Sequence, residues 1–118
     1  MKIGIALLIH EALAENFDAR VDYALGQKIF STVEKIEREV IPFYQKKAVE
    51  IREELTTEKE GGGVAIPVEK YREKINELEQ TEIELELKSF TEEELSKLTV
   101  TPRETFALRE LVKKGETK

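Results

Sequence analysis

The amino-acid sequence predicts a mainly α-helical single domain, built on a long antiparallel helical hairpin that is kinked at Pro42. Two observations predict the hairpin. Apolar residues recur at steps of three and four over about residues 22–58, and a Gly61-Gly62-Gly63 turn separates them from a second, shorter helical pattern. Strict alternation over residues 82–88 adds a small two-stranded β element, and two capping sequences after it predict two short C-terminal helices.

Residues 1–16 form the first predicted element, and their apolar pattern fits two structures. Ile3, Ile5 and Leu7 alternate as in a strand, whereas the spacing from Ile5 onward also suits a helix. We expect a short initial strand that passes into a helix ending near Asn16. The apolar run is too short, and too soon interrupted by polar residues, for a secretion signal or a membrane span.

The strongest helical pattern is an apolar stripe in the first arm of the hairpin. Pro42 lies within it, and we expect one kinked helix because the stripe keeps its phase on both sides. Such a helix would be roughly 55 Å long, whereas a compact chain of this size has a diameter of about 35 Å. Therefore the chain breaks at Pro42, the molecule is elongated, or a second copy covers the stripe. The stripe consists of Ile29, Val33, Ile36, Val40, Tyr44, Ala48, Ile51 and Leu55.

The hairpin is predicted over residues 19–80, with its turn at residues 61–66. Pro67 begins the second helix, at the position where proline is best tolerated. This helix is much shorter than the first. Its apolar face consists of Val68, Tyr71, Ile75 and Leu78.

Residues 82–88 alternate between charged and apolar side chains, which is typical of a strand with one solvated face. Ile83, Leu85 and Leu87 form the apolar face. A lone strand leaves its backbone groups unpaired, so it needs a partner. The other strand-like segment is Lys2–Ile5, and it is the partner that we expect.

Two short helices are predicted within residues 91–114. Thr91-Glu92-Glu93-Glu94 and Thr101-Pro102-Arg103-Glu104 both match the capping box, in which a threonine and a glutamate three residues later bond to each other's backbone. The second of these has proline at the first helical position, and Gly115 is expected to end that helix. Its predicted buried face consists of Phe106, Leu108, Leu111 and Val112.

The composition argues against several classes of function. The net charge is −6, from 19 Lys and Arg against 25 Asp and Glu, and this balance repels a phosphate backbone, so no nucleic-acid partner is expected. The absence of cysteine excludes thiolate metal sites and cysteine nucleophiles. His10 is the single histidine and lacks partners for a catalytic triad or a histidine metal site.

The carboxylates and glycines have structural explanations too. Glu82, Glu84 and Glu86 form the solvated face of the predicted strand, and Glu92–Glu94 occupy a first helical turn, where the helix dipole favours negative charge. Gly61–Gly63 lacks the following Gly-Lys-Ser/Thr of a phosphate-binding loop. We therefore expect no catalytic residue, no metal site and no cofactor, and we predict that the protein is not an enzyme.

Three segments carry a resemblance to a known group of proteins. They are Ala19–Lys28, Glu82–Leu87, and Leu98–Glu104 with the Ala107-Leu108 that follows. Together they resemble short acidic proteins of unknown function that tailed bacteriophages and prophages encode. The resemblance implies a phage or prophage origin and the host cytoplasm as the working compartment, and it transfers no catalytic residue.

We expect a phage accessory protein that binds another protein, as a regulator or inhibitor directed at the host, because a long hairpin with an overhanging apolar stripe presents a surface to a partner. An alternative is a virion structural or assembly component, in which copies in a homo-oligomer bury the stripe between them. A third alternative is an oligomer that binds a host signalling nucleotide, with Arg20 and Lys28 as the anion contacts.

Tyrosine and arginine often anchor interfaces, and the first candidates lie at the start of the long helix. The simpler interpretation, which we prefer, is that Tyr23 packs on the N-terminal element while Arg20 and Lys28 pair with nearby acids. The complete set of interaction candidates is Arg20, Tyr23, Lys28, Tyr44, Ile51 and Leu55.

Overall fold

The computed structural model describes residues 1–55, 57–58, 64–65 and 68–112, and it confirms the mainly α-helical class. The elements, in chain order, are α1 (Ile3–Glu15), α2 (Tyr23–Glu39), α3 (Ile41–Leu55), β1 (Thr57–Glu58), β2 (Val64–Ala65), α4 (Val68–Glu79), α5 (Glu92–Ser96), α6 (Pro102–Leu108) and the 3₁₀ turn η1 (Arg109–Leu111).

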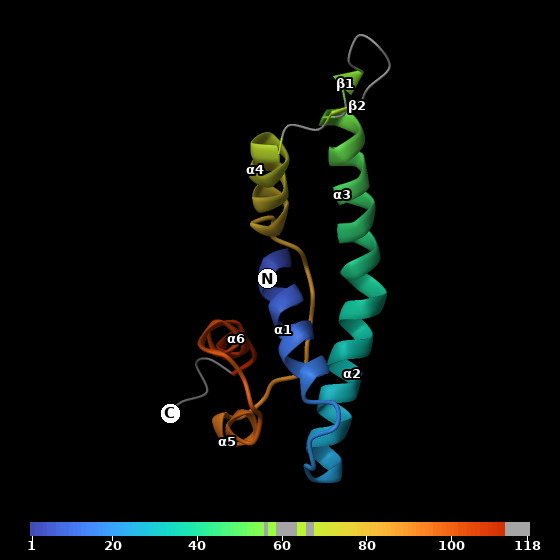
Figure 1. The fold of residues 1–118 in the computed structure, drawn as a ribbon. Coiled ribbons are helices and arrows are strands. Elements are labelled where there is room, and N and C mark those ends of the chain that lie inside the picture. The colour runs from blue at the N-terminus through green and yellow to red at the C-terminus, as the bar shows by residue number, and fades with distance from the viewer. Residues whose placement is uncertain (56, 59–63, 66–67, 113–118) are drawn as a thin grey trace.

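Helices α1 to α4 form two columns that run side by side, and α5 and α6 lie beside these columns, at the lower left of the view (Figure 1). In one column α3 continues upward from α2, and in the other α4 stands above α1, so that α1 lies beside α2 and α4 lies beside α3. The molecule measures 62 × 31 × 24 Å, with a radius of gyration of 17.6 Å. A compact chain of this length would have a radius of gyration of about 13–14 Å. The molecule is therefore elongated, which was one of the three outcomes that the long stripe allowed.

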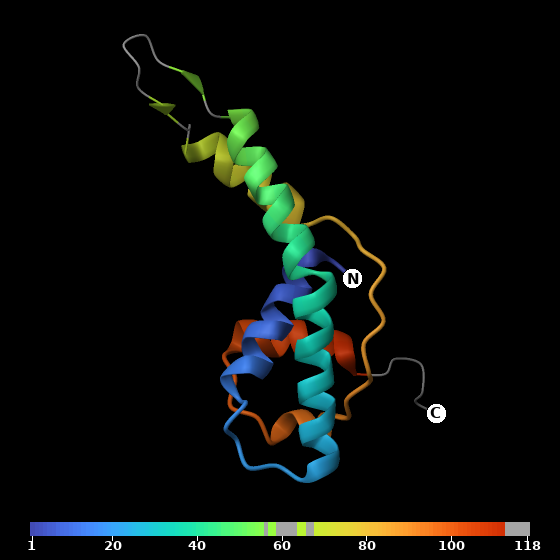
Figure 2. The same ribbon diagram turned by 90° about the vertical axis from the view of Figure 1, so that its right-hand side faces the viewer.

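The predicted long helix is divided at Val40, two residues before Pro42. Val40 is the only residue between α2 and α3, and its dihedral angles (φ −101°, ψ −50°) remain in the right-handed helical region. Its N–H donates to the Ile36 carbonyl and its carbonyl accepts from Tyr44 N–H, so the break is local. Pro42 falls in the first turn of α3, where a missing N–H leaves no bond unmade. Figure 2 shows the column changing direction between α2 and α3.

The α4–α1 column joins two segments that are far apart in the sequence. The C-terminal end of α4 meets the N-terminal end of α1, and Ile3 N–H donates to the Thr81 carbonyl at 3.0 Å. This bond satisfies one of the amides that the first turn of a helix leaves without a partner. The prediction of a strand at Lys2–Ile5 is wrong, because α1 begins at Ile3. Lys2 alone forms a β-bridge, with Glu82.

Residues 82–90, which we call the extended segment, form no sheet among the described residues, so the predicted two-stranded β element is wrong. The predicted alternation is nevertheless present, because Ile83, Leu85 and Leu87 are half-buried against the core and the glutamates between them are exposed. The apolar face packs on helices instead of on a second strand. Helices bury it as well as a sheet would, and sequence periodicity does not distinguish the two partners.

The hairpin tip holds the one short ladder of the described residues, in which Thr57 pairs with Ala65 and Glu58 with Val64. Of the turn predicted at residues 61–66, positions 61–63 and 66 lie outside the described residues, as does Pro67. The second helix of the hairpin is described from Val68 onward and is shorter than either α2 or α3, in agreement with the prediction.

The buried side chains gather at one end of the molecule. We call α1, α2, α5, α6 and η1 the closed end, and α3, β1, β2 and α4 the arm. The closed end supplies most of the core, whereas α3 contains no buried residue and α4 contributes only Leu78. The lower half of the predicted stripe is thus buried, and its upper half, from Tyr44 to Leu55, is half-buried.

The C-terminal helices begin where the sequence predicts. Both capping boxes are present, and Thr101 N–H and Glu104 N–H each bond to the other residue's side chain. The predicted buried face is wrong at Phe106, which is 63% exposed, whereas its neighbour Ala107 is fully buried. α6 ends at Leu108 and η1 at Leu111, so the helix stops before Gly115, which lies outside the described residues.

Candidate functional site

Three exposed aromatic side chains gather at the turn between α1 and α2. Phe17 is 51% exposed, Tyr23 80% and Phe30 58%, and we call these three residues the aromatic patch. The rings of Phe17 and Phe30 stack with their centroids 6.4 Å apart and their planes inclined by 29°. Exposed aromatic residues that gather in this way mark interaction surfaces more often than isolated ones do.

Local interactions hold the chain in position around the aromatic patch. α1 ends at Asn16, whose buried side-chain amide donates to the Ala12 and Thr99 carbonyls at 2.8 and 3.0 Å. Its oxygen accepts from Thr99 N–H at 3.0 Å. At the other side of the turn, Asp22 caps α2 by accepting from Leu25 N–H at 2.8 Å. The residues on both sides of the turn are thus anchored by hydrogen bonds.

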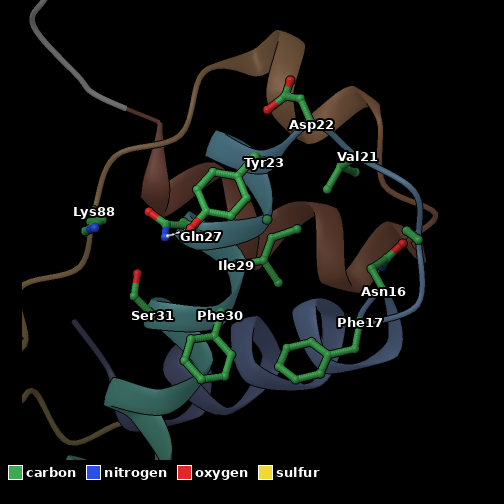
Figure 3. A pocket seen from close by; sticks show the side chains of 12 residues that line it. Asn16, Phe17, Val21, Asp22, Tyr23, Gln27, Ile29, Phe30, Ser31 and Lys88 are labelled. Atoms are coloured by element: carbon green, nitrogen blue, oxygen red, sulfur yellow. Dashed lines mark hydrogen bonds between the residues drawn. The ribbon is translucent and has the colours of Figure 1, made fainter.

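The aromatic patch borders a pocket of about 660 Å³ (Figure 3). Val21 and Ile29 contribute further apolar surface, and Lys88 lies at one side. Asp22 is the pocket's one carboxylate; besides its capping bond, it lies 3.7 Å from Lys97 Nζ. A pocket of this size with a mostly apolar lining suits an apolar group of a partner.

The three interaction candidates at the start of α2 have different environments in the structure. Tyr23 belongs to the aromatic patch and does not pack on α1, contrary to the simpler interpretation. Its hydroxyl accepts from Gln27 Nε2 at 2.7 Å. Arg20 is exposed in the turn. Lys28 pairs with an acid, as the simpler interpretation predicts: its ammonium donates to both carboxylate oxygens of Glu94, at 2.8 and 3.0 Å.

The Lys28–Glu94 pair ties the long column to the C-terminal helices. The Lys28 ammonium also lies 5.5 Å from the centroid of the Phe90 ring. The bond from Lys28, together with the bond from Thr91 N–H, lowers the pKa of Glu94. Lys28 is therefore engaged in a contact within the protein.

The remaining candidates, Tyr44, Ile51 and Leu55, lie on α3 and are half-buried. The Tyr44 hydroxyl donates to Glu79 Oε2 of α4 at 3.1 Å. Burial, followed by this bond and the Glu79 charge, raises the pKa of Tyr44 to about 12. The structure thus uses the upper stripe to pack α3 on α4, and the stripe overhangs less than the sequence suggested.

Sequence reasoning missed Phe17 and Phe30. A signal was present for both. Phe30 follows the stripe residue Ile29 and therefore points away from the buried face, while Phe17 comes directly after the helix-ending Asn16. An aromatic residue outside the predicted core positions is the feature that distinguishes a surface anchor from a core residue.

A cluster of three carboxylates also escaped the sequence analysis, because its members are distant in the chain. Oxygens of Glu11, Glu15 and Glu104 lie within 4.8 Å of one another. The capping box of α6 buries Glu104, which is 2% exposed. A hydrogen bond with Glu104 and its negative charge raise the pKa of Glu15. Packing of α6 on α1 accounts for this cluster.

No helix in the described parts of the chain combines the length and the apolar character that crossing a bilayer requires. Comparisons with protein-family models, with curated proteins and with solved structures find no match for the chain.

Proposed function

We propose that this chain is a non-enzymatic accessory protein of a bacteriophage or prophage, which binds another protein through the aromatic patch. The observation that supports binding is the exposure of Phe17, Tyr23 and Phe30 around one apolar pocket. The viral part of the proposal, with the host cytoplasm as its compartment, is supported by the resemblance of Ala19–Lys28 and the two later segments to tailed-phage proteins.

The chemistry of the patch favours a partner protein that inserts an apolar side chain into the pocket. Aromatic residues are enriched in the centre of protein interfaces, where they supply contact area with little loss of conformational freedom. The net charge of −6 and the exposed Asp18 beside Phe17 favour a partner surface with positive charge around its apolar anchor. A host-directed regulator or inhibitor would act by covering such a surface.

The other polar groups support a binding role over catalysis. His10 Nε2 lies 2.9 Å from Glu37 Oε2, which links α1 to α2 on the outside of the molecule. The carboxylates of Glu15 and Glu104 belong to the α1–α6 contact. Neither group lines the pocket at the aromatic patch.

The test is affinity capture from host lysate, with and without infection, read by quantitative mass spectrometry. Phe17→Ala combined with Phe30→Ala removes the stacked pair, and Phe106→Ala is the matched control, because Phe106 is also more than half exposed and lies outside the patch. We expect one stoichiometric protein with wild type and with the control, and its loss with the double variant. Equal capture by all three proteins would refute the aromatic patch as the site.

A second candidate function is an assembly component that forms a homo-oligomer through the arm. Phe43, Val49 and Val68 are 40%, 45% and 65% exposed, and no described residue of α3 is buried in the single chain. Light scattering after size-exclusion chromatography distinguishes the candidates. A dimer or larger species that Phe43→Ala and Val49→Ala dissociate would favour assembly, and a monomer at high concentration would count against it.

A further inference from the structure

The pocket at the aromatic patch has apolar and polar groups at different edges. Figure 3 shows the stacked rings of Phe17 and Phe30 along its lower edge, and Lys88, Gln27 and Ser31 at its left. An occupant of this pocket must therefore match an apolar surface and a polar surface at once.

Two charged side chains line the pocket, Asp22 and Lys88, and they differ in what they already contact. Asp22 Oδ1 accepts from Leu25 N–H at 2.8 Å, and Asp22 Oδ2 lies 3.7 Å from Lys97 Nζ. Lys88 is exposed and forms no hydrogen bond or ion pair among the described residues. The pocket thus offers an ammonium group without a partner, whereas its carboxylate is already paired.

The Tyr23 hydroxyl supplies a second donor to the pocket. Its oxygen accepts from Gln27 Nε2 at 2.7 Å, so that bond does not use the hydroxyl proton. The Tyr23 side chain is 80% exposed, and its proton can therefore reach an acceptor on an occupant. A hydroxyl donor and an ammonium group in one pocket are complementary to a carboxylate.

We propose that the pocket binds an acidic anchor of the partner protein, which consists of a large apolar side chain and an aspartate or glutamate within one helical turn of it. The apolar side chain would pack on Phe17 and Phe30, and the carboxylate would accept from Lys88 and Tyr23. This inference rests on the proposed function, because it names the group that enters the same pocket.

The surface around the pocket differs in charge from the pocket itself. Asp18 follows Phe17 and Glu34 lies one helical turn beyond Phe30, and both are exposed, whereas Arg20 adds one positive charge in the turn. A partner that matches both parts carries a carboxylate at its anchor and lysine or arginine around it. A second copy of this chain, with its net charge of −6, would meet this surface with like charge.

Three small probes that share a phenyl ring test the anchor without any partner protein. N-acetylphenylalanine is an anion at neutral pH, its amide is neutral, and phenethylamine is a cation. Each is titrated into the full-length, isotope-labelled protein and followed by amide NMR signals. We expect the anion to shift Gly26, Gln27 and Ser31, to bind about fivefold more tightly than the amide, and to lose this preference in high salt. The cation should bind most weakly of the three.

Two substitutions test the groups that would hold the carboxylate. Lys88→Met removes the ammonium group but keeps the length of the side chain, and Tyr23→Phe removes only the hydroxyl. Both residues are exposed, so the fold should persist. The first should weaken binding of the anion about threefold and the second about twofold, and neither should change binding of the amide. Lys74→Met, at an exposed position of α4, is the matched control and should change neither.

Several results would overturn the acidic anchor. They are equal affinity of the anion and the amide, tighter binding of the cation, and a preference for the anion that survives Lys88→Met combined with Tyr23→Phe. The absence of shifts at about 10 mM anion would do so too, since a fragment of roughly fifteen heavy atoms should then bind measurably. So would a wild-type dimer in which the pocket amides are protected, because a second copy would occupy the pocket.

The probes need no host lysate, so failure of the anchor is distinguishable from failure of the proposed function. If the probes fail but the Phe17→Ala and Phe30→Ala protein still loses its captured partner, only the acidic anchor is refuted. If the probes bind as expected but all variants capture equally, the protein partner at the aromatic patch is refuted.

Discussion

The closed end and the arm are each built around a pair of long helices, α1 with α2 and α3 with α4, yet they differ in what holds these helices together. In the closed end, α1 packs on both α2 and α6, and Ile3, Ile9, Leu13 and Ile36 are fully buried. In the arm, α3 and α4 share a single layer of half-buried contacts, and among its described residues only Leu78, near the joint with α1, is buried. This helical pair has no third layer and buries fewer apolar side chains, so most of the folding free energy resides in the closed end.

The largest expected difference between the two regions is in the stability that is lost when one isoleucine in each region is truncated. Ile9→Ala removes a fully buried side chain from α1 and should destabilise the protein by about 2–5 kcal/mol. Ile51→Ala removes a half-buried side chain from α3, and the expected loss is roughly 1 kcal/mol. Urea denaturation followed by circular dichroism measures both. Equal losses would mean that the arm contributes to the core as much as the closed end does.

The two regions meet where the start of α1 contacts the end of α4, and a substitution at Gly4 should weaken this contact. A β-carbon there would lie 3.1 Å from Glu79 Cβ and 3.2 Å from the Glu79 carbonyl oxygen, so α4 would have to move. We expect Gly4→Ala to cost about 1 kcal/mol net, because crowding outweighs the gain in helix propensity. In the Gly4→Ala protein, amide hydrogen exchange should become faster in α4 more than in α2.

Gly26→Ala is the matched control, since Gly26 also lies in the first turns of a helix. Its added β-carbon would meet only Val21 Cγ2, at 3.8 Å, which is ordinary contact. This substitution should stabilise the protein by about 0.5–1 kcal/mol. A stabilising effect of the same size from Gly4→Ala would show that α4 adjusts freely at the joint.

The closed end contains one defect that a substitution can remove. Thr32 is 2% exposed, and its hydroxyl has no hydrogen-bond partner within the described structure. Thr32→Val keeps the shape and replaces the unpartnered hydroxyl with a methyl group, so we expect a gain of about 1 kcal/mol in thermal or urea denaturation. Thr105→Val is the control, because the Thr105 hydroxyl donates to the Thr101 carbonyl, and it should give no gain.

The smallest expected effect is a pH-dependent change in stability, which should occur at the α1–α6 contact and not in the arm. The pKa of Glu15 is raised in the folded state, so its contribution to stability is complete below the unfolded value of 4.5 and is lost as the pH rises through the raised pKa. Glu15→Gln removes this loss and should raise the melting temperature at pH 7 but not at pH 4. Glu53→Gln in α3 should change little at either pH, and a similar response from both would contradict the assignment.

Local signals in the sequence predicted the positions at which several helices begin and end. The capping boxes at Thr91 and Thr101 involve residues three apart, so their bonds form wherever the helix packs. The helix end at Asn16 and the alternation of residues 82–88 were predicted on similar grounds. One helix kinked at Pro42 was predicted, whereas the chain forms two helices divided at Val40, because proline fits the first turn of the following helix.

The sequence by itself thus determined the mainly helical class, the caps and the apolar faces, because these depend on neighbours within one or two turns. The tertiary structure decided which surfaces those faces meet. Ile83, Leu85 and Leu87 pack on helices instead of a strand, α1 starts at Ile3 because Thr81 accepts its first amide, and Tyr44 bonds to Glu79 of α4. It also decided that Phe17, Tyr23 and Phe30 meet at one pocket. Such contacts join residues that are distant in the chain, and no short-range pattern in the sequence identifies which distant residue a side chain will contact.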